Sequence, residues 1–278
     1  MATRSRNTSR RAPSVLPVDI RLMNAAALAV FALAAAVLLA AAIAWTLRAP
    51  TFTLRTIAIE GELTRSNLAT VRANALPRLV GNFFSFDLER GRAAFESVPW
   101  VRQAVLRRVW PNRLSVTLEE HRVAALWQGS SHKDVGNEKL VNLQGEVFEA
   151  NLGDVEDENL VTLGGPDGSA AQVLALHRRL LQVLASVGMS VETLRLSSRG
   201  SWHAELESGA DLELGRGSED EVVARTQRFV RTFEQATSRF ADAGGKPRLL
   251  LAADLRHPDG YALRLRGVST ASAVAAPR

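Results

Sequence analysis

A long apolar run near the N-terminus is the strongest pattern in the chain. Residues 23–47 contain no charged side chain, and Arg48 follows directly. A helix of this length spans roughly 37 Å, which is enough to cross a hydrocarbon core of about 30 Å. The run is longer than the ~7–15 apolar residues of a cleavable signal peptide. Ala42-Ile43-Ala44 nevertheless resembles a cleavage site, so cleavage remains the alternative to the predicted transmembrane helix over 23–47.

Residues 51–121 contain both the alternating apolar pattern of strands and the three- to four-residue apolar spacing of helices. Alternating apolar residues predict strands over 54–60, 103–110 and 114–120, the last with Leu114, Val116 and Leu118 on one face. Helical spacing predicts helices over 66–76 and 88–98. The expected order is strand, helix, helix, strand, strand, and we expect the helices to cover the apolar face of the strands.

Residues 122–267 are predicted to form a strand-rich mixed α+β domain. A hairpin is expected at Gln144-Gly145, an amphipathic helix over 170–187 with Ser169 as its cap, and a long helix over 218–240. Three strands separate these helices, over 191–198, 201–208 and 210–215. Two final strands, 249–256 and 261–266, flank a Pro-Asp-Gly turn. Residues 1–22 and 268–278 are predicted to be disordered tails.

The distribution of charge predicts on which side of the membrane each end of the predicted helix lies. The chain has 34 Lys and Arg against 29 Asp and Glu, and residues 1–22 hold five of the arginines but only one aspartate. The positive-inside rule therefore predicts a cytoplasmic tail over 1–22 and an outer location for the residues after the helix. The basic excess lies on one short tail, which argues against nucleic-acid binding, because a binding domain spreads basic residues over a folded face.

Candidate chemistry is sparse. The chain has no cysteine, and its five histidines show no spacing typical of metal ligands. Gly215-Arg216-Gly217 superficially resembles a dinucleotide loop, but Ser218 and Glu221 have the spacing of a helix capping box. The acidic residues at 154–158 lack the spacing of a calcium loop. We expect no enzyme activity, no cofactor, no metal and no small-molecule substrate.

Several short motifs, taken in order, resemble the FtsQ family of cell division proteins. They are Ile57-x-Ile59-x-Gly61, Gly81-Asn82-Phe83-Phe84, Pro99-Trp100-Val101, Arg107-Arg108-Val109-Trp110-Pro111-Asn112-x-Leu114, Leu214-Gly215-Arg216-Gly217 and Asp254-Leu255-Arg256. The resemblance implies an α+β protein of the inner membrane with one N-terminal transmembrane helix, a POTRA domain over 51–121 and a β-domain over 122–267. It also implies a non-enzymatic scaffold at the division septum that binds FtsB and FtsL and links early to late division proteins.

The last predicted strand is the candidate binding site for FtsB. A final strand is often the edge of a sheet, and a partner strand can pair with its free backbone groups. Tyr261, Leu263 and Leu265 form an apolar face that a partner could bury, unless it packs on the domain's own helix. The resemblance places Arg199 near the FtsB surface, and His257 stands where the family commonly has tyrosine. The predicted site is Arg199, His257, Gly260, Tyr261, Ala262, Leu263, Arg264 and Leu265.

Two other functions remain open from the sequence. The chain could be another POTRA-bearing envelope transport or chaperone component, but such proteins normally continue into a transmembrane β-barrel. Residues 122–267, with two long helices, do not have the pattern of one. It could also be a membrane-tethered envelope enzyme, which the lack of a catalytic residue set argues against.

Overall fold

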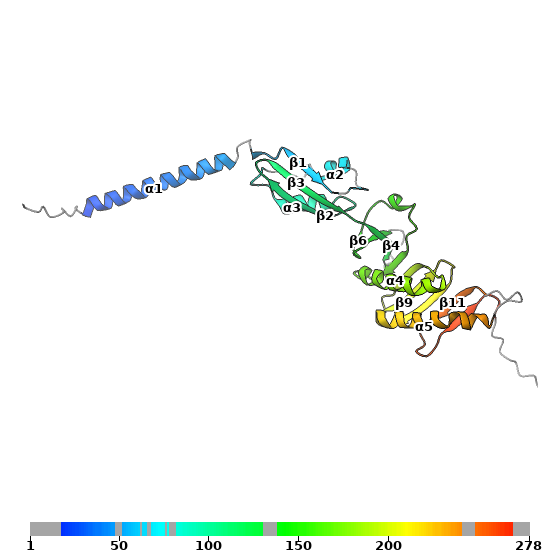
Figure 1. Ribbon diagram of the computed structural model, residues 1–278. Coiled ribbons are helices and arrows are strands. Elements are labelled where there is room, and N and C mark those ends of the chain that lie inside the picture. Colours follow the sequence, from blue (N-terminus) through cyan, green and yellow to red (C-terminus); the bar gives the residue numbers. More distant parts are fainter. Residues whose placement is uncertain are drawn as a thin grey trace, which may run out of the picture.

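A computed structural model describes residues 18–47, 52–61, 63–65, 68–75, 77, 82–129, 138–240 and 248–268. The first helix, α1 (Val18–Leu47), stands apart from the rest of the protein (Figure 1). Its segment Asp19–Thr46 is long and apolar enough to cross a membrane, and no part of that segment is buried by other elements. The helix begins five residues before the uncharged run, so Asp19 and Arg21 lie in its first turns.

The first sheet unit has the predicted element order. It consists of β1 (Thr56–Glu60), α2 (Leu68–Ala75), α3 (Leu88–Glu96), β2 (Val101–Val109) and β3 (Arg113–Glu120). The strand order is β1-β3-β2, with β1 parallel and β2 antiparallel to the central β3. Positions 66, 67 and 76 of the predicted first helix lie outside the described residues.

The core of this unit lies between the sheet and the two helices. The predicted face of β3 is confirmed, because Leu114 and Val116 are fully buried and Leu118 is nearly so. Phe95 of α3 packs against them. Gly91 lets α3 approach this core closely, since a β-carbon at that position would lie 2.6 Å from the ring of Phe86.

Among its described residues, the second sheet unit contains one sheet of nine strands. Its elements are β4 (Val123–Gly129), β5 (Lys139–Asn142), β6 (Val147–Phe148), η4 (Leu152–Val155), β7 (Thr162–Gly165), α4 (Ala170–Leu184), η5 (Ala185–Val187), β8 (Val191–Leu196), β9 (Ser201–Leu206), β10 (Asp211–Arg216), α5 (Glu219–Ser238), β11 (Leu250–Asp254) and β12 (Ala262–Leu265). The strand order is β12-β11-β10-β9-β8-β7-β4-β5-β6. Helices α4 and α5 pack against each other, α4 also against β7 and β8, and α5 against β10. The expected mixed α+β fold is therefore confirmed.

Two predicted helix caps differ in outcome. At α5 the capping box is confirmed, because Glu221 N donates to Ser218 Oγ at 3.3 Å and Ser218 N donates to Glu221 Oε2 at 2.9 Å. At α4 the predicted position is confirmed, because Ser169 is the N-cap residue, but its side chain makes no capping hydrogen bond. The Ser169 hydroxyl instead donates to the Pro166 carbonyl at 2.6 Å. The backbone of Ser169 is already helical, with φ −90° and ψ −2°, whereas a serine that caps with its side chain has an extended backbone.

Candidate functional site

Strand β12 ends the nine-stranded sheet. It pairs antiparallel with β11, with Asp254 opposite Ala262, Ala253 opposite Leu263 and Ala252 opposite Arg264. Among the described residues, no strand pairs with its other side. The last strand is therefore an edge, as expected, and one row of its backbone N–H and C=O groups is left for another strand.

The register shows which backbone groups point outward. Arg266 N donates to Leu249 O at 2.9 Å, so the backbone of Arg266 faces β11. Alternate residues of an antiparallel strand pair with the same neighbour. Arg264 and Ala262 therefore also face β11, whereas the N–H and C=O groups of Leu263 and the N–H of Leu265 point away from the sheet. The Leu265 carbonyl accepts a hydrogen bond from Val268 N at 3.3 Å in the turn that follows β12.

The apolar face of β12 is covered by the protein itself. Leu265 is 5% exposed, and Tyr261 and Leu263 are half-buried against the same core. The ring of Tyr261 lies edge-on to Phe229 of α5 with a centroid distance of 5.3 Å. Its hydroxyl lies 2.7 Å from Thr232 Oγ1 on the same helix. This face therefore packs on the protein's own core, with Tyr261 against α5, which is the alternative to burial by a partner.

The opposite face of the edge is open and hollowed. Ala262 and Arg264 are exposed there. A shallow hollow of about 380 Å³ lies beside them, and its lining includes His203, Asp211, Glu213, Ala252, Asp254, Ala262 and Arg264. The small side chains at 252 and 262 create the space, and three carboxylates give it an acidic wall. The imidazole of His203 lies 3.5 Å from Asp211 Oδ1 and 3.4 Å from Glu213 Oε1.

A two-point ion pair closes the end of β11. Arg256 donates from Nε to Asp254 Oδ1 at 2.9 Å and from Nη2 to Asp254 Oδ2 at 2.6 Å. These hydrogen bonds from Arg256 lower the pKa of Asp254 to about 2. Gly215 has a φ of +80°, and a β-carbon there would lie 2.8 Å from Arg256 Cγ. Glycine at 215 thus makes room for the arginine. Sequence reasoning missed this pair, although the Asp-x-Arg spacing puts both side chains on one face of an extended chain.

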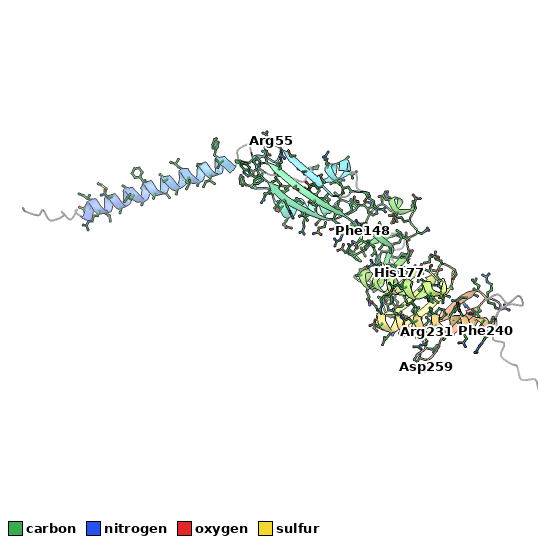
Figure 2. All side chains as sticks on the ribbon, viewed as in Figure 1. Arg55, Phe148, His177, Arg231, Phe240 and Asp259 are labelled. Atoms are coloured by element: carbon green, nitrogen blue, oxygen red, sulfur yellow. The ribbon has the colours of Figure 1, made fainter. Side chains whose placement is uncertain are left out.

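The remaining predicted site residues lie at one end of the sheet. His257 is exposed and Gly260 half-buried in the loop between β11 and β12, where Figure 2 labels Asp259. Arg199 is exposed in the turn between β8 and β9 at the same end. Three strand spacings separate β8 from β11, roughly 14 Å at the usual distance between strands. The structure thus brings His257 and Gly260 to the edge strand but leaves Arg199 at some distance from it.

A second group of side chains joins the two sheet units. Arg102 of β2 bonds to Glu119 at 2.9 Å and to Glu146 at 2.8 Å, and Asn142 also donates to Glu146 at 2.7 Å. The hydrogen bond from Arg102, and to a lesser extent that from Asn142, lowers the pKa of Glu146. His121 stacks on Phe148 at 3.9 Å, and its burial lowers its own pKa. Each carboxylate of this group is held by a charged or amide partner, which is typical of a structural joint. Among the described residues, no group of side chains is placed to hold a metal ion.

Comparisons with known proteins cover both sheet units. The family model of the FtsQ-type POTRA domain matches residues 52–121, and that of the C-terminal part of the cell division protein FtsQ/DivIB matches residues 125–256. The chain is 41% identical over 251 residues to the cell division protein FtsQ of Burkholderia pseudomallei, covering 90% of this chain and 94% of that protein. It is 37% identical to FtsQ of Thiomonas arsenitoxydans, covering 94% of this chain and 92% of that protein. It is 36% identical to FtsQ of Bordetella pertussis, covering 89% and 92% respectively.

Proposed function

Because the chain belongs to the FtsQ family of cell division proteins, we propose that it is a membrane-anchored scaffold of the division machinery and not an enzyme. In this proposal α1 crosses the inner membrane once, with the N-terminus in the cytoplasm and both sheet units in the periplasm. The sheet units bind FtsB and FtsL at the septum and so link early to late division proteins. The apolar composition of α1 and the five arginines in residues 1–22 support this topology.

The free edge of β12 is the observation that carries the proposal. Its outward groups, the N–H and C=O of Leu263 and the N–H of Leu265, are the groups that an added strand pairs with. A strand of FtsB that pairs with them extends the sheet by one strand. Backbone pairing supplies the attraction, and side chains on the open face supply the specificity.

Arg264 is the side chain best placed to select the partner strand. It is exposed on the outer face of the edge, directly beside the row of free backbone groups. An acidic residue of FtsB opposite Arg264 gains a charge-assisted hydrogen bond. Arg199, at the end of the same sheet, gives a second contact to acidic residues of FtsB or of FtsL arriving with it. His257 and Gly260 border the site in the loop that leads into β12.

The test is isolation of the full chain from membranes together with FtsB and FtsL, comparing wild type with Arg264→Glu. We expect the variant to fold normally, because a charge on the open face of a strand remains solvated. Its binding to FtsB should weaken by about 1.5–3 kcal/mol, the typical value of a hydrogen bond to a charged group. Arg231→Glu is the matched control, because Arg231, labelled in Figure 2, is exposed on α5. This helix contacts Tyr261, on the face of β12 opposite Arg264.

Unchanged recovery of FtsB with Arg264→Glu would remove Arg264 from the site. Equal loss of FtsB with both variants would show a general charge effect instead of local contact. Deletion of residues 261–278 is a less specific test than Arg264→Glu, because it disturbs the core as well as the edge strand. It removes Tyr261 and Leu265, which belong to the core.

A further inference from the structure

One end of the first sheet unit exposes a group of apolar side chains, which we call the tip: Phe52, Phe83, Phe84, Val109 and Trp110. Trp110 is 74% exposed in the turn between β2 and β3, Phe84 is 47% exposed, and Val109 at the end of β2 is 43% exposed. The ring of Phe84 contacts those of Phe52 and Phe83 edge-on, with centroid distances of 5.1 and 5.2 Å. The proposed FtsB site does not use any of these residues.

Backbone hydrogen bonds place the tip where the chain arrives from α1. Phe83 N donates to Phe52 O at 2.8 Å, and Arg55 N donates to Asn112 O at 3.0 Å. The segment before β1, the 82–84 loop and the β2–β3 turn are therefore neighbours at one end of the sheet. Figure 2 shows Arg55 at the end of this unit that lies nearest α1.

The covalent connection limits how far the tip can lie from the membrane. Only four residues separate Leu47, the last residue of α1, from Phe52. Five residue steps reach at most about 18 Å in extended chain. The apolar segment of α1 has 28 residues and is about 42 Å long, close to the ~40–45 Å of a bilayer with its headgroups. When α1 spans a membrane, Phe52 therefore lies within about 18 Å of the headgroup layer at the Leu47 end.

The charge of the tip suits an anionic lipid surface. The segments 52–56, 82–86 and 107–113 contain Arg55, Arg107, Arg108 and Arg113 but no aspartate or glutamate. Tryptophan prefers the headgroup layer, where its ring is partly apolar and partly solvated. Basic residues near the surface are attracted to anionic lipids.

We propose that the tip docks on the headgroup layer of the membrane that α1 crosses, with Trp110 inserted and Arg55, Arg107 and Arg113 facing lipid phosphates. Arg108 is left out of this contact, because its Nη2 donates to the Phe86 carbonyl at 2.6 Å. This inference rests on the membrane span assigned to α1 in the proposed function. Docking at both α1 and the tip fixes the angle between the first sheet unit and the membrane. The proposed partner of the tip is a lipid surface, and not a second copy of the chain or a division protein.

The test uses the absence of native cysteine, which makes a single introduced cysteine a unique labelling site. Val109→Cys places an environment-sensitive fluorophore at the tip, and Ser208→Cys in the exposed β9–β10 turn is the matched control. Each labelled full chain is reconstituted into vesicles of phosphatidylethanolamine and phosphatidylglycerol that contain a spin-labelled lipid as quencher. Flotation of the vesicles is measured first, because it reports on the span of α1 alone.

We expect the label at position 109 to shift to shorter emission wavelength and to be quenched by the lipid, and the label at 208 to do neither. Adding Phe84→Ser and Trp110→Ser, or replacing the anionic lipid by phosphatidylcholine, should reduce the quenching at 109. A chain that floats with equal quenching at 109 and 208 overturns the tip proposal but leaves the proposed function intact. A signal at 109 that depends on protein concentration and not on the quencher assigns the tip to a second copy and also overturns it. A chain that does not float contradicts the span and the tip docking together.

Discussion

The indole of Trp100 donates a hydrogen bond from Nε1 to the carboxylate of Asp154 at 2.9 Å, and this bond joins the two sheet units. Trp100 follows α3 of the first unit but is 4% exposed, because it packs with Leu140 and Val155 of the second. The guanidinium of Arg65 lies over its ring at 4.7 Å. Trp100 has a φ of +73°, a conformation that a non-glycine residue keeps only when surrounding contacts hold it.

We therefore expect Trp100→Ala to loosen the joint between the units. Truncation of a buried tryptophan costs about 3–5 kcal/mol, and here the loss falls on the contact between the two units. Calorimetric unfolding of the full chain in detergent should show one transition for wild type and two separated transitions for the variant. Trp110→Ala is the control, because that tryptophan is 74% exposed and its loss should leave unfolding unchanged. A single transition at the wild-type temperature in Trp100→Ala would show that this contact does not stabilise the joint between the two units.

Val116→Asp should unfold the first sheet unit. Val116 is fully buried in the middle of the central strand β3, and aspartate would place a carboxylate among apolar side chains without a partner. The cost is several kcal/mol, a large part of the stability of a small unit. Thr117→Lys, at the exposed neighbouring position, should preserve folding. Cooperative melting of Val116→Asp at the wild-type temperature would show that the core assignment is incorrect.

Acidification should destabilise the second sheet unit through His177. Burial within α4, followed by the charge of Arg178, lowers the pKa of His177 below its ordinary value of about 6.5. The unfolded chain then binds the proton more readily than the folded one, so stability is full above about pH 6.5 and falls as the pH drops below it. Urea midpoints at pH 7.5 and pH 5.5 measure the effect. His177→Leu should reduce the difference between them without abolishing it, because His121 shifts in the same direction. If His177→Leu leaves the difference between the two urea midpoints unchanged, His177 does not contribute to the loss of stability in acid.

The pair of Asp254 and Arg256 predicts an acidic carboxyl group at the end of β11. NMR titration of wild type should find the pKa of Asp254 near 2, and Arg256→Gln should return it toward its ordinary value of about 3.9. Because the folded pKa is depressed, the stabilisation from this pair is present above the unfolded pKa and is lost as the pH falls toward 2. A wild-type pKa near the ordinary value would mean that the two-point contact does not persist in solution.

The apolar pattern was enough to predict most helices and strands, but not which strands lie side by side in a sheet. Alternation at Leu114, Val116 and Leu118 identified the buried face of β3, and the final strand was correctly expected at an edge. Period alone does not determine strand order, so the joining of nine strands into one sheet, with β7 parallel to β4 and β8, was not predicted.

The candidate site was predictable only in part, because its open side depends on tertiary packing. The sequence shows an apolar face at Tyr261, Leu263 and Leu265 and a helix over 218–240, but it does not decide whether that helix or a partner covers the face. The structure packs the face on the protein's own core, with Tyr261 against α5. Long-range contacts also decide the role of Trp100, whose partner Asp154 lies 54 residues away. The docking residues for FtsB at positions 199, 257 and 260–265 stay a prediction.

Hydrogen–deuterium exchange of the full chain, with and without FtsB, tests the edge-strand account most directly. If FtsB adds a strand to β12, exchange of the outward amides of Leu263 and Leu265 should slow when FtsB binds. The amide of Arg264, which already faces β11, should change little. Protection of alternate residues in β12 is the result that the account predicts. Binding of FtsB with unchanged exchange throughout residues 261–266 would contradict it.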